Sequence, residues 1–136
     1  AKAVIDSRRR EKIETTTQLR EIIEKALQFL PAKERKDEIK KCCARTFQAL
    51  RIDVNSEFEV LYDFLEKLPD ALNPGGRVAI LTFHSGEDRL VKKSFKALKK
   101  AGIYSDVANE VIRPSREECN MNPRAKSTKM RWAVKL

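Results

Sequence analysis

The sequence predicts an α/β fold with a mostly helical module at its N-terminal end. Apolar residues in the first half recur at the three- and four-residue spacing of amphipathic helices. Residues 77–83, RVAILTF, form instead a β-branched apolar run without strict alternation, as expected for a strand covered on both faces. A helix, this strand, another helix and a final pair of strands together suggest half of an α/β sandwich rather than a complete one.

The N-terminal helices carry the clearest local signals. Residues 1–12 have the pattern of a helix with an arginine-rich end. In the segment ETTTQLREIIEKALQFLP, Thr15 and Gln18 have capping-box spacing, and Pro31 closes the helical pattern. The highly charged stretch AKERKDEIKK, residues 32–41, favours a solvated helix or loop. We therefore predict a helical module over residues 1–42.

From residue 43 onward the pattern indicates a second domain, residues 43–136. Two helices are predicted before the strand, with a break near Asp53–Ser56, where Asn55 or Ser56 can cap the second helix. The sequence NPGG, residues 73–76, predicts a turn, because proline presets one backbone angle and glycine allows a positive φ.

After the strand, residues 86–102 predict a helix that ends at Gly102. The segments DVANEVIRP and KMRWAVKL predict two further strands, separated by the polar loop SREECNMNPRAKST. A parallel sheet with so few strands would not be stable alone, because its edges and faces find too little to cover them.

Charge and composition narrow the functional classes. A formal net charge of +9 and a pI near 9.6 favour a polyanionic partner, nucleic acid above all. The three cysteines lack zinc spacing, and their odd number argues for a reducing compartment, which we take to be the cytoplasm. No apolar run is long enough to span a membrane. Without a glycine-rich loop after a strand, the sequence predicts no residues that cradle a nucleotide or a methyl-donor cofactor, and it predicts no metal site.

A cluster of polar residues follows the predicted strand and forms the first candidate site. His84 and Ser85 stand just past the strand end, where open α/β sheets bind their ligands. A structural alternative is that Ser85 caps the next helix while Glu87 and Asp88 complement its dipole. Spacing alone favours the capping role, and a lone histidine is weak evidence for catalysis.

Positive charge is concentrated in the tail NPRAKSTKMR. Its basic residues surround Asn122 and Ser127, and such a loop suits phosphate contacts that position an RNA. A plain solvated loop is an equally good interpretation. Arg45 and Arg51 look exposed at helical spacing in RTFQALRIDVN, although packing accounts for most of that segment.

Four ordered motifs resemble one known family. RTFQALRIDVN, LNPGGRVAILTFHSGEDRLVKKSF, IRPSREE and NPRAKSTKMRWA occur here in the order found in the RsmH (MraW) family, whose members methylate the exocyclic N4 of a cytidine in small-subunit (16S) ribosomal RNA. The resemblance covers nearly all of residues 1–136, and TTTQLREII matches the family's helical insertion. Two departures are Gly86, where the family usually has leucine, and KKCCA, which replaces a lead containing His-Pro.

The resemblance implies a fold, a cofactor and site residues. The chain would be the C-terminal half of a Rossmann-like class I methyltransferase, a partial enzyme whose S-adenosylmethionine site lies mainly in the other half. His84 and Ser85 would edge the substrate pocket, and Glu87, Asp88 and Arg89 would support that turn. The residues expected to bind RNA are Arg45, Arg51, Lys92, Asn122, Arg124, Ser127, Lys129 and Arg131.

The partner expected from the resemblance is small-subunit ribosomal RNA or the small ribosomal subunit. An alternative is a non-catalytic RNA-binding module derived from the same half of the methyltransferase. A helical DNA-binding or ribosome-associated protein is supported by charge alone. An exposed sheet edge would also allow two copies to form a homodimer.

Overall fold

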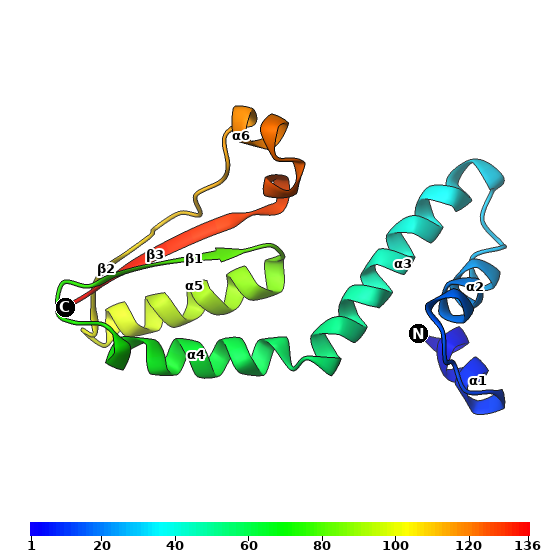
Figure 1. Cartoon of the computed structure of the whole chain (residues 1–136), viewed down its shortest axis with the longest axis horizontal. Helices are drawn as coiled ribbons and strands as arrows, with labels where there is room; N and C mark the ends of the chain where they lie inside the picture. The colour runs from blue at the N-terminus through cyan, green and yellow to red at the C-terminus, as the bar shows by residue number, and fades with distance from the viewer. The chain divides into compact units, whose positions relative to one another are not determined.

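The computed structural model describes residues 1–136 and divides into two compact units, Ala1–Asn55 and Ser56–Leu136 (Figure 1). The first unit consists of helices alone, and the second combines helices with a three-stranded sheet. The mixed helix and sheet content confirms the predicted α/β class. Neither unit contains a helix whose length and hydropathy would let it span a membrane.

The first unit contains α1 (Lys2–Arg10), α2 (Thr16–Ala26) and α3 (Ala32–Val54). The predicted capping box starts α2: the Thr15 hydroxyl accepts from the Gln18 backbone N–H at 3.2 Å, and the Gln18 side chain accepts from the Thr15 backbone N–H at 3.0 Å. Leu19 and Ile23 are its buried residues. The helix ends before Pro31, which directly precedes α3.

The charged stretch 32–41 is helical and belongs to α3. This helix continues without a break through residues 42 and 43, and the compact units divide at Asn55 instead. The boundary at residue 42 concerns the extent of an inserted module and stays a prediction.

The second unit contains α4 (Glu57–Ala71), β1 (Arg77–Thr82), α5 (Ser85–Lys100), β2 (Tyr104–Val107), α6 (Arg116–Met121), the 3-10 helix η1 (Pro123–Ser127) and β3 (Lys129–Lys135). Ser56 holds the cap position of α4 with φ 48° but makes no side-chain cap bond, so the predicted break is confirmed while the predicted cap is not. The polar loop before β3 contains α6 and η1, which the sequence did not indicate.

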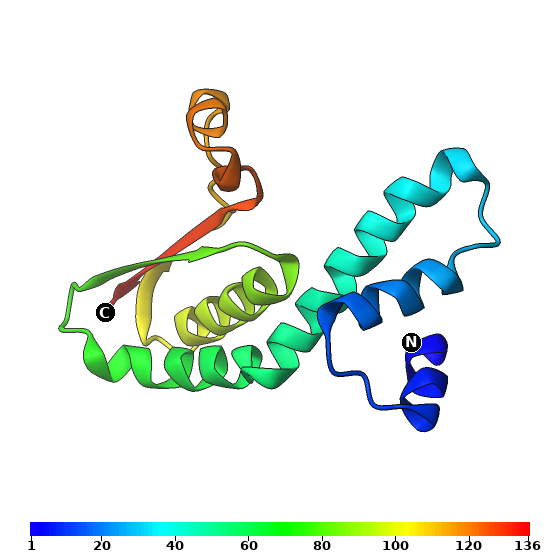
Figure 2. The same ribbon diagram turned by 45° about the vertical axis from the view of Figure 1, so that its right-hand side comes forward.

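The sheet has the strand order β1-β3-β2, and β3 is antiparallel to both neighbours. The expected parallel pairing is therefore wrong, because the last strand of the chain inserts between β1 and β2 and separates them. The β1–β3 register places Ala79 opposite Trp132 and Thr82 opposite Lys129. Helices α4 and α5 lie on one side of the sheet (Figures 1 and 2). The expectation that β1 is covered on both faces is also wrong, since Leu81 is 58% exposed.

The core of this unit lies between the sheet and its two helices. Buried residues of α4, α5, β2 and β3 form one cluster: Leu65, Leu68, Val91, Phe95, Tyr104, Val107 and Ala133. The Phe95 and Tyr104 rings meet edge to face, with centroids 5.6 Å apart. Gly102 ends α5 as predicted, at φ 74°, and the Ile103 N–H donates to the Leu98 carbonyl at 2.9 Å in a Schellman motif.

The buried Tyr104 hydroxyl has no hydrogen-bond partner, and burial raises the pKa of this phenol. We expect Tyr104→Phe to preserve the fold and to stabilise the unit by up to about 1 kcal/mol, because an unsatisfied buried hydroxyl costs free energy. Urea unfolding of both proteins measures this. The raised pKa also means that the wild type loses stability as pH rises above about 10, where the unfolded phenol ionises, and the variant lacks this component. A clear loss of stability in Tyr104→Phe at neutral pH would show that the hydroxyl is satisfied.

Candidate functional site

The chain turns directly from the carboxyl end of β1 into α5, and His84 is the residue that caps the helix. His84 Nδ1 accepts from the Glu87 backbone N–H at 3.4 Å. In return, Glu87 Oε2 accepts from the backbone N–H groups of Phe83 at 3.0 Å and His84 at 3.3 Å. Of the two roles that the sequence left open, capping is therefore present, but His84 performs it instead of Ser85. Ser85 occupies the first helical position with an exposed side chain.

The His84 ring is held on three sides. It meets the Phe58 ring of α4 edge to face, with centroids 5.7 Å apart. Its Nε2 lies 3.3 Å from Glu87 Oε1 without the alignment of a hydrogen bond, and this nitrogen is buried. Gly86 allows Phe58 to come close, because a Cβ at residue 86 would lie 2.7 Å from Phe58 Cζ. Gly86 is thus matched to this aromatic contact.

Glu57, His84 and Glu87 bring their ligand atoms within 4.8 Å of one another, which is close enough to hold a metal ion. Two features weigh against that use. Nδ1 accepts a backbone N–H, so the proton of a neutral ring sits on Nε2 and makes this nitrogen a donor. The positive end of the α5 dipole also lies at this position and disfavours a cation. The arrangement suits a hydrogen-bond donor better than a metal ligand.

Glu87 has a structural role that substitution can isolate. We expect Glu87→Ala to cost about 0.5–2 kcal/mol, because two backbone N–H groups at the start of α5 lose their acceptor. Glu87→Gln keeps an acceptor oxygen at the same reach and should cost clearly less. Thermal unfolding of the three proteins checks the order, and equal losses in both variants would rule out the capping role.

Asp88 ties the first turn of α5 to the sheet. Arg131 Nε donates to Asp88 Oδ1 at 2.7 Å, and a second guanidinium nitrogen donates to Oδ2 at 3.3 Å. The side chains are only 7% and 16% exposed for Arg131 and Asp88. Asp88 was predicted to support this turn, whereas Arg131 was predicted to contact RNA. This geometry gives the Arg131 guanidinium a structural partner, and its contact with RNA stays an untested prediction.

The predicted RNA-contacting residues of the tail reach the same end of the sheet as His84. Thr82 at the end of β1 pairs with Lys129 at the start of β3, and the Thr82 hydroxyl donates to the Lys129 carbonyl at 3.3 Å. Just before β3, Asn122 caps η1 by accepting from the Arg124 N–H at 3.2 Å. Buried Ala125 anchors this short helix, while Arg124 and Ser127 are exposed.

The other predicted basic residues lie on helices. Arg89 and Lys92 are exposed on α5, and Arg45 and Arg51 are exposed on α3 of the first unit. Arg45 lies 3.6 Å from Glu38 in an exposed ion pair, an interaction that contributes little. These residues therefore divide between the two units. The second unit carries Arg89, Lys92 and the tail residues together with His84, and the first unit carries Arg45 and Arg51.

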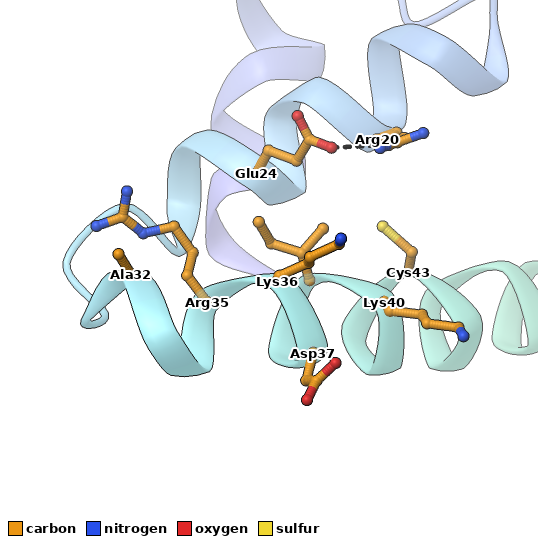
Figure 3. A pocket seen from close by; sticks show the side chains of 9 residues that line it. Arg20, Glu24, Ala32, Arg35, Lys36, Asp37, Lys40 and Cys43 are labelled. Carbon is orange, nitrogen blue, oxygen red and sulfur yellow. Dashed lines mark hydrogen bonds and ion pairs between the residues drawn. The ribbon is translucent and has the colours of Figure 1, made fainter.

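A groove between α2 and α3 contains basic residues that the sequence did not indicate as a site (Figure 3). Its volume is about 660 Å³. Arg20 donates to Glu24 at 2.7 Å, and Arg35 donates to the carbonyls of Leu30 and Gln28, so both arginines are held by this unit's own acceptors. Lys36 and Lys40 complete the basic lining. In the sequence, a spacing of four residues places Lys36 and Lys40 on one face of a helix, but it does not show that a second helix lies opposite them.

Comparison with known proteins agrees with the family resemblance of the four sequence motifs. The family model described as the MraW methylase family matches residues 1–136. A relative from Lachnoclostridium phytofermentans, "Ribosomal RNA small subunit methyltransferase H 1", is 68% identical over 99% of this chain and 37% of its own length. A protein of the same name from Agathobacter rectalis is 69% identical over 99% of this chain and 39% of its own length.

A more distant relative, "Ribosomal RNA small subunit methyltransferase H" from Maridesulfovibrio salexigens, is 43% identical over 97% of this chain and 44% of its own length. The chain therefore spans less than half the length of these curated relatives. The match lies in their C-terminal portion, as the motifs predicted.

Proposed function

Because the chain belongs to the MraW methylase family, we propose that it forms the C-terminal part of an enzyme that methylates the N4 amine of a cytidine in small-subunit ribosomal RNA, with S-adenosylmethionine as the methyl donor. In this proposal the chain contributes RNA contacts and one wall of the substrate pocket, and the rest of the family's polypeptide completes the enzyme. RNA of the small subunit, or the small subunit itself, is the partner, and the cytoplasm is the compartment.

One observation supports this function above the others: exposed basic groups and the half-buried histidine that caps α5 share one end of the sheet. Ligands of α/β proteins bind at the carboxyl ends of strands, and the end of β1 carries His84 and Ser85. Lys129 begins the neighbouring strand. An RNA backbone held by the tail would place a splayed base near these side chains.

The chain's own residues suit orientation of a base. The exocyclic amine of cytosine is a poor nucleophile because its lone pair is delocalised into the ring, so it must be held in place and must lose a proton. Ser85 offers an exposed hydroxyl. The His84 ring is fixed by its cap bond to the Glu87 N–H, and its buried Nε2 faces Glu87, so His84 serves to position this turn. Glu87 is occupied by the helix cap, so we assign no general base among these residues.

The glycines of this chain do not fit a cradle for S-adenosylmethionine. Gly75 and Gly76 belong to the turn before β1, Gly86 lies against Phe58, and Gly102 ends α5. None of them forms a glycine-rich loop from a strand to a helix. We infer that the cofactor is bound mainly by the part of the family's chain that this chain does not span.

We also propose that the second unit is part of a Rossmann-like sheet. β1 and β2 run parallel to each other because both are antiparallel to β3, and α5 connects them. A strand, a helix and a parallel strand make the repeating unit of doubly wound folds. Further strands beyond β1 would extend it in the complete enzyme.

RNA binding can be tested on this chain alone. We expect the double variant Arg124→Ala/Lys129→Ala to bind a small-subunit RNA fragment more weakly and with a flatter salt dependence. Each phosphate that the variant no longer neutralises should lower the slope of log K against log salt concentration by about 0.7–0.9. Fluorescence anisotropy at several salt concentrations measures both quantities.

The matched control removes the same charge from the second half of α5, as Lys96→Ala/Lys100→Ala. It should change the slope less, because these lysines lie near β2 and away from His84. Equal slopes in the two double variants would assign the effect to net charge alone and would remove the tail from the RNA surface.

A second candidate function is a non-catalytic RNA-binding module, favoured by the exposed basic residues and by glycines that form no cofactor cradle. Titration of S-adenosylmethionine into the folded chain does not separate the two, since both predict no heat. Methyl transfer after addition of the missing portion does separate them.

A further inference from the structure

We propose that Phe83 is a stacking platform for the cytosine that is methylated, so that its ring holds one face of the unstacked base at the carboxyl end of β1. This inference rests on the proposed function and names the residue that positions the substrate base. The ligand is a single-stranded pyrimidine nucleotide, whose flat ring offers a π-face to an aromatic side chain.

Phe83 stands at the end of the sheet where α/β proteins bind their ligands. It follows Thr82, the last residue of β1, and precedes His84, which caps α5. Thr82 is also the last residue of β1 that pairs with β3, through Lys129. Phe83 therefore lies one residue past the paired region, at the carboxyl end of the strand.

The side chain of Phe83 is 57% exposed. Burial of a phenylalanine ring stabilises a fold, so an exposed ring at a ligand-binding edge indicates a role in binding. The other exposed aromatic residues lie elsewhere: Phe29 follows α2, and Tyr62 and Phe64 belong to α4. Phe83 is the exposed aromatic residue at the end of the sheet that carries the candidate site.

The backbone on both sides of the ring is fixed by hydrogen bonds. The Phe83 N–H donates to Glu87 Oε2 at 3.0 Å, and the His84 N–H donates to the same oxygen at 3.3 Å. On the other side, the Thr82 hydroxyl donates to the Lys129 carbonyl at 3.3 Å. A stacking residue on a backbone held in this way loses little further conformational entropy when a base binds.

The neighbouring groups suit the rest of a nucleotide. Lys129 begins the strand opposite Thr82, and Arg124 is exposed on η1 just before it, so both can contact phosphates. Ser85, two residues after Phe83, presents an exposed hydroxyl that can donate to or accept from the edge of a base. Because every base has a π-face, the ring positions the base and leaves the choice of cytosine to polar groups at its edge.

The test uses this full chain and a short single-stranded RNA in which one cytidine is replaced by pyrrolocytidine, a fluorescent analogue whose emission falls when its ring stacks. We expect the wild type to quench the emission on binding. Phe83→Leu keeps the apolar bulk without an aromatic face, so it should abolish most of the quenching and weaken binding by about tenfold. Phe83→Tyr keeps the aromatic face and should retain both.

Salt dependence separates stacking from phosphate contacts. A stacked base releases no counterions, so Phe83→Leu should lower the affinity at every salt concentration and leave the slope of log K against log salt concentration unchanged. The double variant of Arg124 and Lys129 should lower that slope. Phe64→Leu is the matched control, because Phe64 is 48% exposed on α4, outside the sheet, and it should change neither the quenching nor the slope. Thermal unfolding of each variant confirms that the fold is kept.

Quenching that persists in Phe83→Leu, or that Phe64→Leu reduces equally, would overturn the proposal. Binding of the RNA by the wild type without quenching would overturn it as well. Addition of the unmatched portion of the Agathobacter rectalis relative should leave the quenching in place. Its loss on that addition would mean that polypeptide, and not a base, covers the ring, and the proposal would be wrong.

Failure of the stacking proposal and failure of the proposed function give different results. Quenching that depends on Phe83, in a chain whose completed enzyme methylates no cytidine, would support the platform and contradict the function. Cytidine N4-methylation together with RNA binding that ignores Phe83 would support the function and overturn the platform.

Discussion

Asp88→Ala is expected to lower the free energy of unfolding of the second unit by about 3–5 kcal/mol, because it leaves a buried guanidinium without its counter-charge. Arg131 donates two hydrogen bonds to Asp88, and its side chain is 7% exposed. Water cannot replace the carboxylate at that depth. Urea unfolding followed by the fluorescence of Trp132, on the same strand, measures the loss.

Two further variants separate the charge from other effects. Asp106→Ala removes the partner of Lys99 in an exposed pair of the same 2.7 Å length and should cost much less. The hydrogen bond from Lys99 lowers the pKa of Asp106, so this pair's contribution is present above the carboxyl's unfolded pKa and is lost as pH falls. Asp88→Ala/Arg131→Met replaces the buried charge with an apolar chain and should recover much of the stability. No recovery would mean that the cost of Asp88→Ala has another source.

Phe95→Ala is expected to cost about 3–5 kcal/mol, because it opens a cavity at the centre of the only extensive core of the second unit. Phe95 is 2% exposed, and its ring packs edge to face against Tyr104. Its removal takes away packing that joins α5 to β2. Denaturant unfolding measures the change, and the slope of the transition shows whether the variant still unfolds in one step.

Phe64→Ala makes the same chemical change on α4, where the ring is 48% exposed. It should cost clearly less than Phe95→Ala, since about half of the Phe64 area is already in water. Similar losses at both positions would show that the packing between α5 and the sheet is not the main stabilising contact.

Local signals in the sequence predicted most of the elements. The capping box at Thr15, the break before α4 and the glycine that ends α5 depend on residues close in the chain, and all three are confirmed. The β-branched run 77–83 predicted β1 for the same reason. Such signals act within one or two turns of backbone, so a single sequence contains them.

Those local signals could not predict which strands pair or which distant side chains meet. The order β1-β3-β2 depends on the last strand inserting between two earlier ones, and no local pattern specifies that partner. The pairing of Asp88 with Arg131 joins residues 43 positions apart. The capping role fell to His84 because its Nδ1 reaches the Glu87 N–H, although serine is the commoner cap and stands next to it. The groove between α2 and α3 likewise requires two helices to be placed together.

In the proposed function, this chain supplies the RNA-contacting part of a ribosomal RNA cytidine methyltransferase. The most direct test incubates small ribosomal subunits and S-adenosylmethionine with this chain, with the unmatched portion of the Agathobacter rectalis relative, and with the two together. Mass spectrometry of the digested RNA then locates any new methyl group. We predict N4-methylcytidine with the two together and none with either part alone. Methylation by this chain alone, a methyl group on another base, or no transfer by an intact complex would contradict the account.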